Sequence, residues 1–343
     1  MARIVVLTGG STPERDVALA GAAQVVAALR RTGYDVTVVD TVSGALTAGE
    51  ESRLLVPSVG KEPPTPERIA VLEAAELGDA LLDLPAMRQA DLVFPVLHGR
   101  QGEGGEMQAL LQSAGIPYAG SGPEGSALAM DKDRAKRRFV QVGVPTAAWR
   151  TWPAPVADIE RLGLPLVVKP SKVGSTVGLT VVRSLRDLDA AVAEAARYDD
   201  QVLLEAYVPG REFTVGVLGE RALAVGEIVP SHEIFDYECK YTPGMTREIF
   251  PAAIPEDLAD RMQRLALVAH RALLLEDFSR VDFRLGDDGV PYCLEVNTLP
   301  GLTATSLLPQ SAQAVGIPFD ALCNEVCQLA LARPRNKAGG RGI

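Results

Sequence analysis

Two β-rich runs decide the fold: Ser279-Arg280-Val281-Asp282-Phe283-Arg284-Leu285 and Val290-Pro291-Tyr292-Cys293-Leu294-Glu295-Val296-Asn297. The Asp288-Gly289 pair between them is typical of a two-residue hairpin turn. Such a turn predicts that Asp282 faces Glu295 and that Arg280 faces Asn297. The opposite, apolar face of the hairpin would then carry Val281, Phe283, Tyr292, Leu294 and Val296.

The hairpin predicts a metal site, because two carboxylates on directly opposed positions repel each other and destabilise a sheet. A divalent cation with oxygen ligands would compensate, and Asn297 would supply a neutral oxygen. The alternative is a solvated polar face in which Arg280 neutralises one carboxylate. Residues 298–303 carry the strand end into a Gly turn, where backbone N–H groups can meet an anion. This favours a functional site over the solvated face.

A second segment has the features of a phosphate site. Lys169 ends the run Leu166-Val167-Val168-Lys169, and the turn Gly174-Ser175-Thr176-Val177-Gly178 follows. Small residues let N–H groups and hydroxyls close over phosphate oxygens. An ordinary hairpin turn is the alternative, and neither a Walker A spacing nor the protein-kinase motif set is present. Together with Lys132 and the acidic hairpin, the turn would supply the charge, cover and Mg²⁺ that phosphoryl transfer needs.

The N-terminal part alternates strand and helix patterns. The run Ile4-Val5-Val6-Leu7 leads into Gly9-Gly10 and a helical pattern, and the run at 92–97 leads into the His98 loop. This predicts a parallel sheet whose ligands bind beyond the carboxyl ends of the strands. Residues 44–68, rich in Gly, Pro and charge, are expected to form a long surface loop. Residues 120–122 are expected to form a domain junction.

Composition narrows the class of protein. The 343 residues hold 34 basic and 44 acidic side chains, a formal net charge of −10, which argues against nucleic acid or an anionic membrane as partner. No apolar run reaches the roughly 18 residues that a membrane span needs. Four cysteines without a framework spacing favour reduced thiols and a cytoplasmic location. Three scattered histidines make a zinc site improbable.

The ordered set of motifs resembles the D-alanine–D-alanine ligases of the ATP-grasp superfamily over nearly the whole chain. The matching pieces are Gly9-Gly10-Ser11-Thr12-Pro13-Glu14-Arg15, His98-Gly99-Arg100-Gln101-Gly102-Glu103, Met130-Asp131-Lys132, Val168-Lys169-Pro170, Gly174-Ser175-Thr176-Val177-Gly178, Glu212-Phe213-Thr214-Val215, Lys240-Tyr241, Arg280-Val281-Asp282, Glu295-Val296-Asn297 and Thr305-Ser306-Leu307.

The resemblance implies an α/β fold (α+β overall) of the ATP-grasp type. An N-terminal Rossmann-like parallel-sheet domain would span 1–122 and a central ATP-grasp subdomain 123–208. A C-terminal subdomain with the Mg²⁺ site would span 209–332, before a flexible tail at 333–343.

The resemblance also implies a role for each matching residue. Lys132, Lys169 and Lys240 would hold ATP phosphates, while Glu205 and Glu212 would contact adenine and ribose. Asp282, Glu295 and Asn297 would hold two Mg²⁺ ions, which Mn²⁺ can replace. Glu14 and His98 would meet the first substrate, with Ser175 and Tyr241 closing two loops over it. Arg280 and the Gly301 N–H would stabilise the oxyanion, and Ser306 and Leu307 would bind the second carboxylate.

The implied reaction joins two D-alanine molecules through an acyl phosphate, releases ADP and phosphate, and serves peptidoglycan precursor synthesis. The resemblance also implies a homodimer, with residues 231–250 and the Gly174 turn as lids that exclude water. Four positions depart from the family pattern: Ala18, Gly104, Thr176 and Ala206. Ala18 and Gly104 lie near the first substrate, so a sibling ligase with other amino acids remains an alternative. A catalytically silent nucleotide-binding protein is the other.

Overall fold

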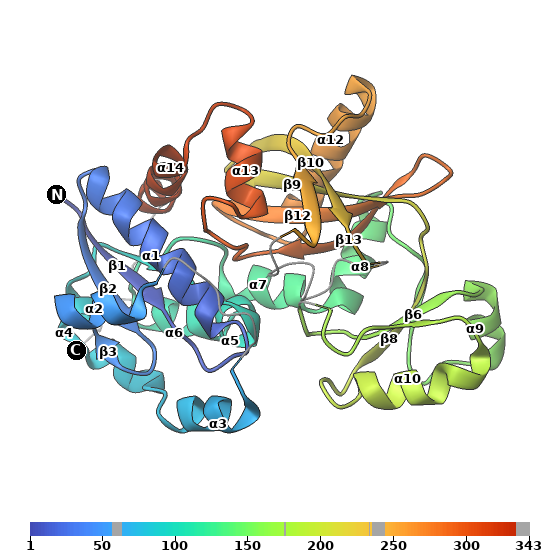
Figure 1. Cartoon of the computed structure of the whole chain (residues 1–343), viewed down its shortest axis with the longest axis horizontal. Helices are drawn as coiled ribbons and strands as arrows, with labels where there is room; N and C mark the ends of the chain where they lie inside the picture. Colours follow the sequence, from blue (N-terminus) through green and yellow to red (C-terminus); the bar gives the residue numbers. More distant parts are fainter. Residues whose placement is uncertain (57–63, 175, 233, 235–243, 334–343) are drawn as a thin grey trace, which may run out of the picture.

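The computed structural model describes residues 1–56, 64–174, 176–232, 234 and 244–333, and these form three sheets (Figure 1). The N-terminal sheet has the order β3-β2-β1-β4. Its strands are β1 (Arg3–Thr8), β2 (Asp35–Asp40), β3 (Gly44–Ala45) and β4 (Leu92–Pro95). Strand β1 pairs in parallel with β2 and β4, as the alternating pattern predicted, so the residues after β1 and β4 meet at one edge.

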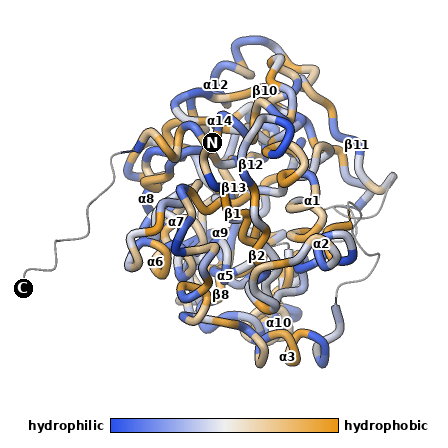
Figure 2. The backbone as a smooth tube through the Cα atoms, turned by 90° about the vertical axis from the view of Figure 1, so that its left-hand side faces the viewer, coloured by the Kyte–Doolittle hydropathy of each residue, from blue (hydrophilic) through white to orange (hydrophobic). Residues whose placement is uncertain are grey.

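Helices cover both faces of this sheet because its central strands are apolar on both sides. In β1, Ile4 and Val6 pack toward one core and Val5 and Leu7 toward another. The helical segments of this part are α1 (Arg15–Arg31), α2 (Ala48–Leu54), α3 (Pro66–Ala74), η1 (Gly78–Asp83), α4 (Pro85–Gln89), α5 (Gly99–Glu103) and α6 (Glu106–Ser113). Hydrophobic and hydrophilic residues mix along these helices in Figure 2, as amphipathic helices require.

The prediction of one long loop at 44–68 was wrong. Strand β3 and helix α2 occupy its first part, and α3 begins at Pro66, while residues 57–63 lie outside the described residues. The Thr47 hydroxyl caps the Glu50 N–H, and the Glu50 carboxylate accepts from the Thr47 N–H. This capping box satisfies free N–H groups at the start of α2 and makes the short helix possible despite its polar composition.

The central sheet is four-stranded, with order β5-β8-β6-β7. Its strands are β5 (Trp149–Thr151), β6 (Leu166–Pro170), β7 (Thr180–Val182) and β8 (Val202–Ala206), and α9 (Val156–Leu162) and α10 (Leu188–Ala195) cover one face. Strand β7 begins three residues later than the predicted 177–182 strand. Register places Val167 opposite Glu205, so Lys169 and Glu205 are diagonal neighbours on the face away from these helices.

The third sheet is antiparallel, with order β11-β10-β9-β12-β13. Its strands are β9 (Arg211–Leu218), β10 (Arg221–Pro230), β11 (Thr246–Ile249), β12 (Phe278–Leu285) and β13 (Pro291–Asn297). One apolar face packs on α7 (Pro123–Met130), α8 (Lys132–Gln141) and α12 (Glu256–Ala272). The other face carries α13 (Leu307–Gln313), and α14 (Phe319–Ala332) returns to pack on α1 and the N-terminal sheet.

The β12–β13 hairpin pairs Asp282 with Glu295 and Arg280 with Asn297, as predicted. Its turn is longer than predicted, because Leu285 pairs with Pro291 and the loop spans residues 286–290. A β-bulge then shifts the register between Asp282 and Phe283 and restores the predicted pairs.

Val296 faces the core as predicted, but the same bulge overturns the predicted positions of Tyr292 and Leu294. Phe283 faces Cys293, which is fully buried in the core below the sheet. Tyr292 instead hydrogen-bonds Asp288, and Leu294 lines a pocket on the polar side. The irregular segment predicted at 231–250 also contains strand β11. None of the described helices combines the length and hydropathy of a membrane span.

Candidate active site

Asp282 is the centre of a hydrogen-bonded cluster on the polar face of the third sheet. It is 7% exposed and accepts from Thr214 Oγ1 at 2.7 Å and from Asn297 Nδ2 at 2.9 Å. Arg280 donates to both carboxylate oxygens, with Nε at 3.0 Å from Oδ1 and Nη2 at 2.8 Å from Oδ2. The arginine pairing proposed as the alternative to a metal is therefore present. It neutralises Asp282 and leaves Glu295 to another partner.

That partner is Lys132, whose Nζ lies 3.1 Å from Glu295 Oε2 and donates to the Val173 carbonyl at 2.9 Å. Helix α8 starts at Lys132 because the Asp131 carboxylate caps it by accepting from the Arg134 N–H. The Ser171 hydroxyl donates to the same carboxylate and ties the helix start to the end of β6. The lysine therefore bridges the acidic hairpin and the turn after Lys169, where phosphates were predicted.

The donor set of the hairpin fits Mg²⁺. Asp282, Glu295 and Asn297 come from opposed positions of two strands and carry carboxylate and amide oxygens, the ligands that hard divalent cations prefer. Each carboxylate already has a cationic partner: Arg280 of the same strand lies beside Asp282, and Lys132 of α8 lies beside Glu295. Among the described residues, no group of three or more His, Cys, Asp and Glu side chains could hold a metal, so the amide of Asn297 would be needed as the third ligand.

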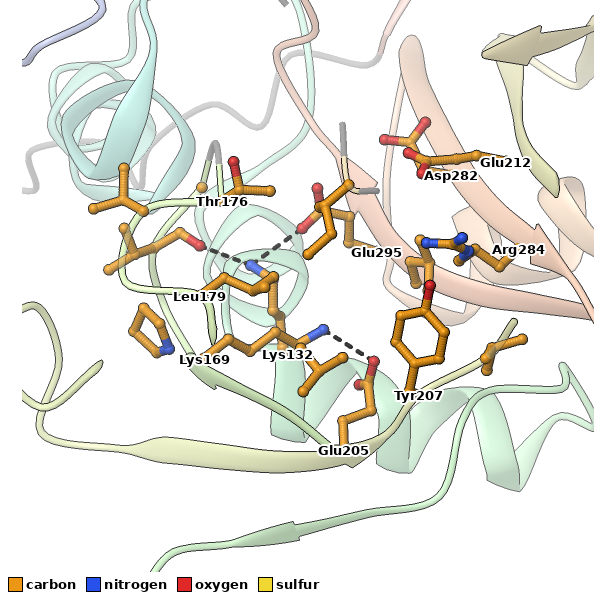
Figure 3. A pocket seen from close by; sticks show the side chains of 18 of the residues that line it. Lys132, Lys169, Thr176, Leu179, Glu205, Tyr207, Glu212, Asp282, Arg284 and Glu295 are labelled. Carbon is orange, nitrogen blue, oxygen red and sulfur yellow. Dashed lines mark hydrogen bonds and ion pairs between the residues drawn. The ribbon is translucent and has the colours of Figure 1, made fainter. Parts of the chain in front are cut away.

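A pocket joins this cluster to the central sheet (Figure 3). Lys169 from β6 points to Glu205 from β8, with 3.1 Å between Nζ and Oε1. The predicted nucleotide contacts that line the pocket are Lys132, Lys169, Glu205 and Glu212, together with Asp282 and Glu295. Tyr207, Leu294 and Ala206 add apolar and aromatic surface, and aromatic or apolar walls suit a flat base. The pocket therefore combines charged groups with apolar and aromatic surface.

Arg280 and His98 lie where the N-terminal sheet meets the third sheet. Burial lowers the pKa of His98, the charge of Glu14 opposes this, and Arg280 adds to the lowering. Glu14 lies in the loop after β1, and His98 follows β4. Because β1 and β4 are parallel neighbours, both residues lie at the same edge of the sheet, as predicted. Burial would lower the pKa of Arg280, but the carboxylates of Asp282 and Glu295 raise it above its ordinary value. Arg280 is therefore a cation fixed beside Asp282 and close to His98.

Gly301, Ser306 and Leu307 also come together. A Cβ built on Gly301 would lie 3.0 Å from Ser306 Oγ, so the glycine permits this close approach. Ser306 Oγ accepts from the Thr303 N–H at 3.1 Å and precedes α13, where Leu307 is buried. Ser311 Oγ donates to the Ala224 carbonyl at 2.6 Å and accepts from the Gly216 N–H at 3.3 Å, which fixes α13 on the sheet.

Three predicted site residues, Ser175, Lys240 and Tyr241, lie outside the described residues. Sequence reasoning also missed three charged residues at or beside the pocket: Glu103, Lys136 and Arg284. Lys136 stands four residues after Lys132, a spacing that shares a helix face and could have indicated it. Arg284 lines the pocket opposite Glu212 and lies 5.4 Å from the Tyr207 ring, and these neighbours follow from the pairing of β12 with β9, which are distant in the sequence.

Glu103 carries a strongly shifted carboxyl group. Burial, aided by the nearby charge of Glu14, raises its pKa from 4.5 to about 8, although it accepts from the Gly99 N–H at 3.0 Å. The folded chain therefore holds the Glu103 proton more tightly than the unfolded chain does. It follows that ionising Glu103 costs stability as the pH rises from about 4.5 to about 8.

Replacing Glu103 by glutamine should remove this pH dependence. Glutamine keeps an oxygen for the Gly99 N–H but carries no charge. The free energy of unfolding of Glu103→Gln should therefore rise relative to that of wild type as the pH increases from 5 to 8. Denaturant unfolding at several pH values in that window measures the difference. Parallel profiles for the two proteins would show that Glu103 titrates normally.

Gly104, one of the departures from the family pattern, has a packing reason. A Cβ at this position would lie 2.4 Å from the Arg100 carbonyl oxygen, although the backbone angles suit any residue. Gly104→Ala should therefore destabilise the fold by about 1–3 kcal/mol through overpacking. Thermal unfolding measures this, with Gly49→Ala in α2 as the control, where no described atom lies within 4 Å. Equal melting temperatures in the two variants would contradict the packing argument.

Comparisons with known proteins agree with this geometry. The family profile described as "D-ala D-ala ligase N-terminus" matches residues 3–121, and "D-ala D-ala ligase C-terminus" matches residues 141–328. A D-alanine–D-alanine ligase of Anaeromyxobacter sp. (strain Fw109-5) is 41% identical over 329 residues, covering 94% of this chain and 95% of the relative.

Solved structures show the same likeness. The VanG D-Ala:D-Ser ligase of Enterococcus faecalis superposes with a TM-score of 0.79 at 30% identity, covering 96% of this chain and 99% of the other. The Bacillus anthracis D-alanine–D-alanine ligase complexed with ATP has a TM-score of 0.75 at 28% identity, with 96% and 98% coverage. The fold and the site therefore define an ATP-dependent ligase with the ATP-grasp fold. Within that class, the chain belongs to the D-alanine–D-alanine ligase family.

Proposed function

We propose that the chain ligates two D-alanine molecules to D-alanyl-D-alanine at the expense of ATP, for cell-wall precursor synthesis. The observation that carries the proposal is the convergence of Lys132, Lys169, Arg280 and the acidic β12–β13 hairpin on one pocket in a chain of this family. The carboxylate of the first D-alanine would attack the γ-phosphate and give an acyl phosphate and ADP. The amine of the second D-alanine would attack the acyl carbon, and phosphate would leave.

The residues divide the work of binding and charge neutralisation. Lys132, Lys169 and Lys240 would hold the phosphates, and Glu205 and Glu212 the adenine and ribose. Asp282, Glu295 and Asn297 would hold two Mg²⁺ ions, which when bound neutralise the phosphate oxygens. The position of Lys132 between Glu295 and the turn after β6 supports its assignment to the phosphates.

Amino-acid recognition would use the interface between the N-terminal and third sheets. Glu14 would receive the ammonium group of the first D-alanine beside His98, with Ser175 and Tyr241 closing over it. Arg280 and the Gly301 N–H would stabilise the tetrahedral oxyanion, because both are fixed donors in a site shielded from water. Ser306 and Leu307 would bind the carboxylate of the second D-alanine. The approach of Ser306 to Gly301 supports one shared site.

The proposal is tested by ADP release coupled to a panel of D- and L-amino acids, singly and in pairs. D-alanine alone should support turnover, with D-alanyl-D-alanine as the product identified by mass. Pairs of D-alanine with D-serine belong in the panel, because the structural relative from Enterococcus faecalis is named as a D-Ala:D-Ser ligase. Turnover only with another amino acid would overturn the D-alanine assignment, and ATP binding without ADP formation would indicate a silent nucleotide-binding protein.

We also propose that the enzyme works as a homodimer in the cytoplasm, with the domain limits 1–122, 123–208 and 209–332. Three buried thiols, at Cys293, Cys323 and Cys327, are free rather than disulfide-bonded, which suits a reducing compartment. Light scattering on the purified chain tests the dimer, and a mass of one 36.4 kDa chain would contradict it.

A further inference from the structure

Two lysines share one buried carboxylate beneath the nucleotide pocket. Glu205 is 3% exposed, with Lys169 Nζ at 3.1 Å from Oε1 and Lys136 Nζ at 2.7 Å from Oε2. Burial alone would raise the pKa of Glu205, but the two lysines bring it below its ordinary value, so the carboxylate is ionised. Burial lowers the pKa of Lys136, and the charge of Glu205 opposes this lowering. With both lysines protonated, the trio has one positive charge more than the carboxylate needs.

The two lysines are not equivalent. Lys169 and Glu205 line the pocket, whereas Lys136 does not and is wholly buried. Lys136 lies on α8, donates to Thr146 Oγ1 at 2.6 Å and lies 5.3 Å from the centre of the Trp149 ring. The Thr146 hydroxyl in turn donates to the Cys293 carbonyl at 2.8 Å, which connects the trio to the hairpin strand β13. Lys136 therefore contacts the carboxylate of Glu205 from the protein interior, whereas Lys169 contacts it from the pocket.

This asymmetry has an electrostatic consequence. An ionised carboxylate in such a buried place is costly unless a cation stays beside it. If Lys169 were its only partner, moving Lys169 to a phosphate would leave the buried carboxylate of Glu205 without a counter-ion. With Lys136 in place, Lys169 can leave and Glu205 keeps a partner.

We infer that Lys136 is a positioning residue: it is the permanent counter-ion of Glu205 and allows Lys169 to exchange Glu205 for the phosphates of bound nucleotide. The inference rests on the proposed function, in which Lys169 binds ATP phosphates. Lys136 itself touches neither nucleotide nor amino acid. It acts on ATP binding only through Glu205.

The test is a double-mutant cycle between Lys136→Met and Glu205→Gln, read as the KM for ATP, the KM for D-alanine and kcat. In Lys136→Met, Lys169 is held by Glu205, so the KM for ATP should rise about tenfold, the size of one charge-assisted hydrogen bond. The KM for D-alanine should stay within about twofold. In the Glu205→Gln background, adding Lys136→Met should change the KM for ATP little, because the carboxylate through which Lys136 acts is gone.

Controls separate this role from a general loss of folding. Lys136→Arg keeps the charge and should keep the KM for ATP closer to wild type than Lys136→Met does. Arg138→Met, an exposed position on the same helix, should leave all constants unchanged. If Lys136→Met does not fold, the KM for ATP of the double variant, compared with that of Glu205→Gln alone, still tests whether Lys136 acts through Glu205.

Three outcomes would overturn the inference. The first is a wild-type KM for ATP in folded Lys136→Met. The second is an equal rise in the KM values for ATP and D-alanine. The third is a further tenfold loss on adding Lys136→Met to Glu205→Gln. A wild-type chain that forms no ADP with any amino acid would instead overturn the proposed function, so the two failures are distinguishable.

Discussion

Replacing Glu295 by glutamine is expected to lower kcat for ligation by at least about 100-fold, since even residues that only support metal ligands contribute 10–100-fold. Glutamine keeps the shape of the side chain but removes the negative charge that faces Asp282 across the hairpin. It also removes the ion pair with Lys132. The proposed cation site and the position of Lys132, a proposed phosphate contact, should therefore be weakened together.

Two measurements separate loss of metal binding from loss of folding. The variant should require more Mg²⁺ for half-maximal activity, and its melting temperature should respond less to Mg²⁺ with ATP, because ligands stabilise only the state they bind. Without ligands, its melting temperature should stay close to wild type, since the loss of the ion pair with Lys132 is offset by the removal of one of two facing like charges. Asp288→Asn, in the exposed loop of the same hairpin, is the control and should keep full activity. Near-normal turnover of Glu295→Gln at saturating Mg²⁺ would show that Glu295 is not a ligand.

The hairpin also shows how far periodicity predicts structure. The pairing of Asp282 with Glu295 was confirmed, but the predicted turn was too short, and a bulge near Leu294 compensated for the difference. Strand alternation contains no signal for a bulge, because the extra residue depends on packing between the strand and its neighbours. The predicted positions of Tyr292 and Leu294 were therefore wrong although the carboxylate pair was right.

Other differences had signals that could have been used. Thr47 and Glu50 have the spacing of a capping box, and Thr65 precedes Pro66 as a cap precedes a first-turn proline, so α2 and α3 were recognisable within the expected loop. The spacing from Lys132 indicates the helix face of Lys136 but not its partner, because Glu205 comes from strand β8, a separate element distant in the sequence. Long-range pairs between charged residues depend on the assembled fold, whereas the motifs around Lys132 and Asp282 are local.

Arg280→Ala is expected to lower kcat by about 10²–10³, the loss seen when one oxyanion donor is removed. Two tasks of Arg280 must be separated: it neutralises Asp282 through its hydrogen bonds, and in the proposed mechanism it also stabilises the oxyanion. Arg280→Lys keeps a positive charge beside Asp282 but cannot donate in two directions from a planar fork. If the charge alone matters, the lysine variant should be close to wild type. If the directed donors matter, both variants should be slow.

The two half-reactions decide where Arg280 acts. We expect the larger loss in amide formation, so the variants should release ADP with less dipeptide than wild type as acyl phosphate is lost to water. The ratio of D-alanyl-D-alanine to ADP, measured in one assay, tests this, with Arg271→Ala at an exposed ion pair as the control. A ratio equal to that of wild type, together with an unchanged kcat, would refute the role. A low kcat with an unchanged ratio would place Arg280 before the acyl phosphate forms, where its charge beside Asp282 would act on phosphoryl transfer.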